Sequence, residues 1–169
     1  RFGHALVNHD APVDLLEAIA RNLSAAAVEV EQGPVRDRLA SMMASERTRA
    51  LLSGDEPTPP VNGAALDFAP YGLIGGPANP LGVDATYHRD GPDVVATLTL
   101  GAAFEGPPGR AHGGVVSAVI DETMTALLTT LGTAAFTRSL QVDYVGPAPL
   151  HTPLHFRARL CERDDRALV

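Results

Sequence analysis

A glycine-rich loop that leads into an apolar helix holds the residues best suited to chemistry in this 169-residue chain. The loop runs from Gly106 to Gly114 and ends in His112-Gly113-Gly114. Glycines let a ligand approach the backbone closely, and the N–H groups at the start of a helix attract negative charge. Such amides can stabilise a carbonyl oxygen that becomes an oxyanion. A tight loop without any function has the same composition, so the loop alone does not identify a site.

One carboxylate stands out on the helix that follows this loop. Ser117, Asp121 and Thr125 recur every four residues, so they share one face of a helix whose other positions are mostly apolar. A carboxylate is costly to bury unless it is paired or serves a task. Asp121 is therefore a candidate functional residue, and the alternative is that Asp121 and Glu122 simply reach solvent at the edge of a domain.

The pattern around these residues predicts a sheet packed on one long helix. Alternating apolar and polar residues predict strands over 83–88 and 94–100, joined by a turn at Asp90-Gly91, and again over 136–144 and 154–160. The helix over 114–131 is apolar nearly all round, which is typical of a buried helix. Residues 162–166 form a charged turn before the start of a fifth strand, which we expect to be incomplete at residue 169. The order predicts an α+β fold in which an antiparallel sheet wraps around the helix.

The first third of the chain has a helical pattern instead. A helix over 12–31 begins at Pro12, and a second, opened by Pro34, continues to about residue 52. Residues 53–60 have the composition of a linker, and 62–82 that of an ordered loop. We therefore divide the chain into a helical segment with linker at 1–61 and a second domain at 62–169.

Composition narrows the class of protein. The chain is 45% hydrophobic with a net charge of −7, which is ordinary for a soluble globular protein and argues against a nucleic-acid partner. All 13 basic residues are arginine, which excludes Walker-type loops and lysine Schiff bases. Cys161 is the only cysteine, which suits a reducing compartment. We see no secretion signal and no apolar run of about 18 residues, and we therefore expect a cytoplasmic protein without a membrane span.

Taken together, the motifs resemble the hot-dog-fold acyl-CoA thioesterases. The resemblance rests on the run from Phe104 to Gly109, on His112-Gly113-Gly114, and on Asp121 nine positions after the histidine. It is closest to the branch that contains the THEM-type and the phenylacetate-pathway thioesterases, and it covers roughly residues 75–169. The other matching pieces are Asn79-Pro80-Leu81-Gly82, Thr137 and Leu140-Gln141-Val142-Asp143-Tyr144.

This resemblance implies hydrolysis of acyl-CoA thioesters to free acid and CoA, as part of fatty acid metabolism. The backbone N–H of Gly113 or Gly114 would polarise the thioester carbonyl. Asp121 would act as general base or as nucleophile, and Thr137 would hold the attacking water or orient the carboxylate. His112 is a further candidate in the catalytic site, with the expected role of holding the loop in shape.

The resemblance also implies a homodimer, or a dimer of dimers, with each site between two protomers. Asp121 and the His112-Gly113-Gly114 loop would then come from different chains. Glu122 is the fallback carboxylate, although one step along a helix rotates it by about 100°. Two hydroxyls on the helix face and two arginines suited to CoA phosphates are candidates for substrate binding: Ser117, Thr125, Arg110 and Arg138.

Other functions stay open at this stage. A non-catalytic acyl-CoA sensor could use residues 1–55 to bind DNA, but six arginines against eight acids make that segment acidic. A hot-dog hydratase or dehydratase needs a paired histidine and acid that we cannot place. We expect no cofactor and no metal, since Pro153 between His151 and His155 argues against a zinc site. The acyl group and the role of the first helices are not fixed by the sequence.

Overall fold

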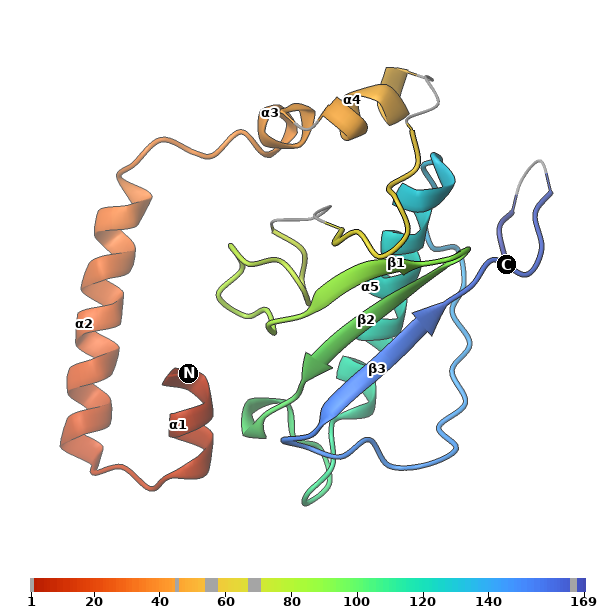
Figure 1. The fold of residues 1–169 in the computed structure, drawn as a ribbon. Helices are drawn as coiled ribbons and strands as arrows, with labels where there is room; N and C mark the ends of the chain where they lie inside the picture. The colour runs from red at the N-terminus through yellow and green to blue at the C-terminus, as the bar shows by residue number, and fades with distance from the viewer. Residues whose placement is uncertain (1, 45, 54–57, 67–70, 165–166) are drawn as a thin grey trace. The chain divides into compact units, whose positions relative to one another are not determined.

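The computed structural model describes residues 2–44, 46–53, 58–66, 71–164 and 167–169 (Figure 1). The chain separates into two compact units, Arg1–Arg49 and Ala50–Val169. The predicted boundary between residues 61 and 62 stays a prediction.

The first unit is helical. It contains α1 (Phe2–Asn8), α2 (Val13–Glu31) and α3 (Arg38–Met43), and α4 (Glu46–Ser53) crosses into the second unit. The predicted helix over 12–31 is confirmed by α2. The single helix predicted after Pro34 is wrong, because the structure has two short helices there, and α1 was not predicted because seven residues are too few to show a helical period.

The second unit contains a three-stranded antiparallel sheet in the order β1-β2-β3 (Figure 1). β1 (Thr86–Asp90) pairs with β2 (Asp93–Thr99), and β2 also pairs with β3 (Pro153–Ala158) along its other edge. Gly91, with φ of 61°, allows the tight turn between β1 and β2. These three strands match the predicted strands at 83–88, 94–100 and 154–160.

The long helix α5 (Gly113–Leu131) packs against one face of this sheet and contacts all three strands (Figure 1). The side chains that it buries recur at helical spacing: Val119, Thr123, Ala126, Leu127 and Thr130. Gly132 ends the helix in the left-handed conformation, with φ of 62°. The predicted buried helix and the α+β architecture are therefore present.

α5 also has a length and composition that would let it cross a membrane, and no other described helix does. Core helices of soluble proteins meet the same criteria, and α5 lies against the sheet. The absence of a membrane span and the cytoplasmic location stay predictions.

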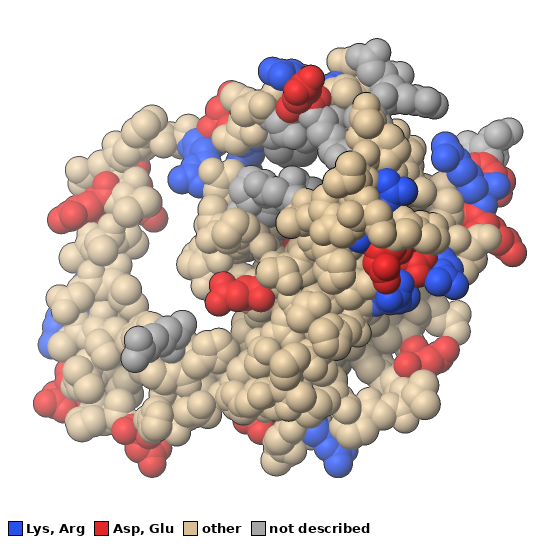
Figure 2. All heavy atoms as spheres, viewed as in Figure 1, with Lys and Arg blue, Asp and Glu red and all other residues tan. Residues whose placement is uncertain are grey.

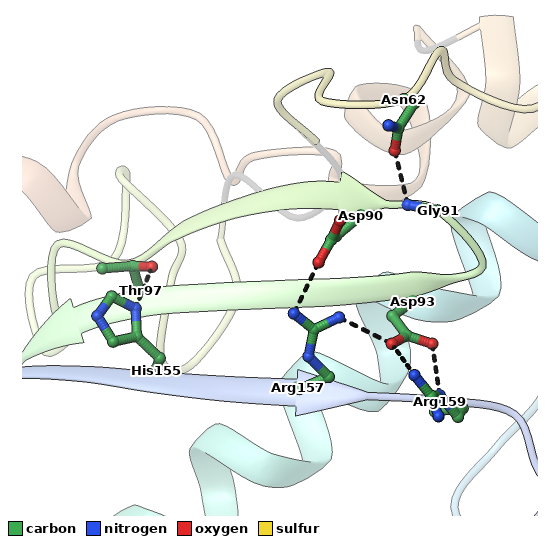
Figure 3. Close-up of polar contacts among 8 residues, drawn as sticks. All are labelled: Asn62, Asp90, Gly91, Asp93, Thr97, His155, Arg157 and Arg159. Carbon is green, nitrogen blue, oxygen red and sulfur yellow. Dashed lines mark hydrogen bonds and ion pairs between the residues drawn. The ribbon is translucent and has the colours of Figure 1, made fainter.

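An ion-pair cluster joins the β1–β2 turn to the end of β3 (Figure 3). The carboxylate of Asp93, only 1% exposed, accepts hydrogen bonds from Arg159 Nε and Nη2 at 2.8 and 2.7 Å and from Arg157 Nη1 at 2.8 Å. Arg157 Nη2 also donates to Asp90 Oδ2 at 2.6 Å. The two bonds from Arg159, and then the one from Arg157, lower the pKa of Asp93 to about 2. In Figure 2 the described residues of this face are mostly uncharged, and basic and acidic groups lie side by side in places.

The prediction of a strand over 136–144 is wrong. This segment is irregular and forms no ladder with any described strand. Phe136 and Val145 are 99% and 98% exposed. A period-two pattern predicts which way side chains point along an extended chain, but a strand also needs a neighbour to accept its backbone hydrogen bonds, and that neighbour is not encoded locally.

The last residues form a small pairing of their own. Arg163 pairs with Leu168, and Cys161 N and Glu162 N both donate to Val169 O, at 2.6 and 2.9 Å. The predicted fifth strand is thus represented by a single bridge outside the three-stranded sheet. The predicted charged turn includes residues 165 and 166, which lie outside the described residues.

Candidate active site

The His112-Gly113-Gly114 loop is anchored by backbone pairings on both sides. Glu105 pairs with Ala111, and Arg110 pairs with Pro149. His112 N donates to Phe104 O at 2.8 Å, which ties the loop to a short 3-10 turn, η1 (Ala102–Phe104). These contacts fix the point at which the chain enters α5.

The imidazole of His112 caps the start of α5. Its Nδ1 accepts a hydrogen bond from Gly114 N at 3.0 Å, and the expected role of the side chain in holding the loop in shape stays a prediction. The two glycine amides therefore differ. Gly114 N–H is engaged by His112, whereas Gly113 N–H meets no acceptor among the described residues. Gly113 is the amide available to a ligand.

Tyr144 lies against the same helix start. Its hydroxyl donates to Gly113 O at 3.0 Å and contacts the Ser117 hydroxyl, which itself donates to Gly113 O at 3.1 Å. An ideal Cβ on Gly113 would lie 3.3 Å from the Tyr144 ring, so the close approach favours glycine. Sequence reasoning missed this role of Tyr144, because its spacing from Gly113 follows no local rule.

The carboxylate of Asp121 is half-buried and pairs with Thr137. Thr137 Oγ1 donates to Asp121 Oδ1 at 2.6 Å, across sixteen positions of sequence. Val119, two positions earlier in α5, is buried. Two helical steps of about 100° rotate Asp121 by about 200° from Val119, so its side chain points away from the sheet. The segment over 134–148 therefore covers the outer face of α5 through Thr137 and Tyr144.

Asp121 and Gly113 lie at different heights on α5. Eight positions separate them, which corresponds to about 12 Å along the axis at 1.5 Å per residue. The two groups are therefore about two helical turns apart on α5.

The fallback carboxylate Glu122 has a different environment. Its Oε2 accepts from Ile74 N at 2.9 Å, and its Oε1 accepts from Gly75 N at 2.6 Å and from the Tyr87 hydroxyl at 3.2 Å. Burial, and secondarily the charge of Glu122, raises the pKa of Tyr87 above its usual range. Glu122 thus binds the 71–82 loop and is not directed at Thr137. No pattern in the sequence indicated this contact.

The remaining predicted residues are dispersed. The Thr125 hydroxyl donates to the backbone O of Asp121 at 3.1 Å. Arg110 and Arg138 are exposed, and their side chains form no ion pair with any described residue. Among the described residues, no group of three or more His, Cys, Asp or Glu is placed to hold a metal. His155 Nδ1 instead lies 3.0 Å from the Thr97 hydroxyl (Figure 3).

The structure thus places an amide that is unpaired among the described residues at the start of α5 and a paired carboxylate on the outer face of the same helix. Comparison with known proteins gives the family context of this fold. Residues 108–168 match the family described as Thioesterase superfamily. A solved structure of a thioesterase superfamily protein superposes with a TM-score of 0.72 at 27% identity, over 98% of this chain and 77% of that one.

Two curated relatives each match part of the chain. Acyl-coenzyme A thioesterase THEM4 of Xenopus laevis is 38% identical over 64 residues, covering 38% of this chain and 29% of that protein. Acyl-coenzyme A thioesterase THEM5 of Homo sapiens is 34% identical over 74 residues, covering 44% of this chain and 30% of that protein. The match spans less than a third of each relative. The chain has the hot-dog fold of the thioesterase superfamily, which confirms the resemblance and the fold class.

Proposed function

We propose that this protein hydrolyses acyl-CoA thioesters to a free carboxylic acid and CoA. The observation that carries the proposal is the Asp121–Thr137 pair on the outer face of a helix whose first amide, that of Gly113, is unpaired among the described residues. The names of the two curated relatives support the same activity.

The chemistry follows from these groups. Gly113 N–H donates to the thioester carbonyl oxygen and stabilises the oxyanion of the tetrahedral intermediate. Asp121 takes a proton from water, and the resulting hydroxide attacks the carbonyl carbon. Collapse of the intermediate breaks the C–S bond, and the CoA thiolate recovers the proton from Asp121. Direct attack by the carboxylate, through an anhydride that water then cleaves, uses the same residues. Thr137 orients the carboxylate in either route.

The site is proposed to lie between two protomers. Asp121 and Gly113 lie roughly 12 Å apart along α5, and a dimer in which the amide of one chain faces the carboxylate of another would bring the two groups onto one carbonyl group. A two-fold axis then creates two equivalent sites in a homodimer, and a dimer of dimers would keep the same pairing.

Substrate binding is assigned to the predicted neighbours. Ser117 lies one helical turn before Asp121 on the same face. Arg110 and Arg138 are exposed and unengaged among the described residues, which leaves their guanidinium groups available to CoA phosphates. Thr125 flanks Asp121 on its other side.

A thiol-release assay on a series of acyl-CoAs tests the proposal. Asp121→Asn is expected to lower kcat by about 10²–10⁴, the contribution of a positioned base, while substrate still binds. Asp14→Asn, an exposed acid-to-amide change on α2, serves as the matched control and is expected to keep full activity. Equal turnover by both variants would overturn the assignment, and acyl-CoA binding without any turnover by the wild type would favour the sensor.

A further inference from the structure

A pocket of about 370 Å³ opens on a second flank of α5, away from Asp121. Glu122 forms part of its wall, and most of the remaining surface is apolar. The other walls come from the 65–66 stretch, from Gly75 and Pro77 in the 71–82 loop, and from residues 83–87 at the start of β1. None of the predicted catalytic residues lines it.

The wall next to Glu122 is fixed by specific contacts. Two loop amides and the Tyr87 hydroxyl all donate to the Glu122 carboxylate. Gly75 packs directly on Tyr87, since an ideal Cβ there would lie 2.5 Å from the tyrosine ring. Val83 N donates to Ile74 O at 2.6 Å and closes the loop from the other end. Hydrogen bonds and close packing within the fold thus hold this wall of the pocket in place.

We propose that this pocket binds the acyl group of the thioester, an inference that rests on the proposed function. Glu122, which forms part of the pocket wall, directly follows Asp121 in α5. One helical step of about 1.5 Å and 100° therefore separates the Asp121 position from that wall. An acyl chain that starts at Asp121 can therefore turn around the flank of the helix.

The dimensions and charges define the class of acyl group. Pockets that bury small molecules span about 300–1,000 Å³, and 370 Å³ lies near the lower end. The pocket therefore accepts a compact group, such as a medium-length aliphatic chain or one aromatic ring. Glu122 and Asp84 in its wall repel a second carboxylate, so the acyl group is neutral.

Narrowing the pocket tests this inference. Ala65→Trp fills it from the 65–66 stretch, and Pro77→Trp fills it from the 71–82 loop; both positions are exposed, so the fold should tolerate them. Ala64→Trp, at the adjacent position and outside the lining, is the matched control. Calorimetry with two non-hydrolysable thioether analogues, S-ethyl-CoA and S-octyl-CoA, measures affinity in the full chain without any turnover.

The wild type and Ala64→Trp are expected to bind S-octyl-CoA more tightly than S-ethyl-CoA. Each pocket variant should lower that ratio about tenfold, the effect of losing burial for roughly two methylene groups. An unchanged ratio in both pocket variants, or no octyl preference in the wild type, overturns the assignment. If the ratio falls but the wild type cleaves no acyl-CoA, the proposed hydrolysis fails while the pocket stands. If thioesters are cleaved and the ratio is unchanged, only the pocket assignment fails.

Discussion

Replacing Gly113 with proline removes one backbone N–H at the first position of α5 while preserving the helix. Proline is tolerated at that position, where the N–H has no acceptor within the helix and φ near −65° suits the first turn. The preceding residue, His112, already has φ of −64° and ψ of 130°, in the extended region that proline requires of its neighbour. We therefore expect Gly113→Pro to fold.

The expected loss follows from the role of the amide. Removing one donor from an oxyanion site costs about 2.7–4 kcal/mol, or roughly 10²–10³ in kcat. Gly113→Ala is the matched control, because it keeps the N–H and adds a Cβ at the position 3.3 Å from the Tyr144 ring. The Tyr144 ring has to yield by a few tenths of an ångström to the added Cβ in both variants, whereas only proline removes the N–H and puts a ring carbon where that hydrogen lay.

Steady-state thiol release gives kcat and KM for each variant, and circular dichroism with thermal melting reports the fold. Gly113→Pro should lose 10²–10³ in kcat, as for other single donors, and Gly113→Ala less than about tenfold. Equal losses in the two variants at equal Tm would show that crowding against Tyr144 causes the effect, and would refute the role of the amide.

Two further predictions concern Thr137 and Asp93. Thr137→Val removes the 2.6 Å hydrogen bond to the Asp121 carboxylate and should lower kcat by about 10–100-fold, the value of a bond to a charged group. Thr137→Ser keeps the hydroxyl and should restore most activity; a serine variant as slow as valine would contradict this role. Arg159 and Arg157 lower the pKa of Asp93 from 3.8 to about 2. The ionised Asp93 carboxylate therefore contributes fully to the free energy of unfolding above about pH 4, and this contribution is lost as the pH falls toward 2. Melting curves of Asp93→Asn should show a lower Tm at pH 7 and a weaker dependence of Tm on pH between pH 4 and 2. A pH dependence of Tm equal to that of the wild type would refute this role of Asp93.

Much of the fold could be predicted because its signals are local. The apolar period of α5 and the glycine at 132 that ends it lie within twenty residues of sequence, as does the alternation of β1 and β2 around Gly91. The segment over 136–144 has the same alternation and still forms no ladder with the described strands. The pattern determines an extended chain, whereas the neighbour that makes it a strand comes from tertiary structure.

The candidate site likewise contains some residues that local sequence signals predict and others that they do not. The amides at the start of α5 and the outward-facing Asp121 follow from helix geometry, and the Asp121–Thr137 contact was expected from the family resemblance alone. The bonds from Glu122 to Ile74 N and Gly75 N span 48 and 47 positions, and the contact of Tyr144 with Gly113 spans 31. Long-range contacts of this kind leave no periodic signal, so these residues were missed.

Mixing two inactive variants tests most directly whether the amide and the carboxylate come from different protomers. Asp121→Asn and Gly113→Pro are combined in equal amounts under conditions that exchange subunits, and thiol release is measured. Half of the dimers then carry one variant on each chain, and each has one intact site out of two, so about a quarter of wild-type activity should return. If exchange occurs and activity stays at the level of the separate variants, the site is not shared between protomers.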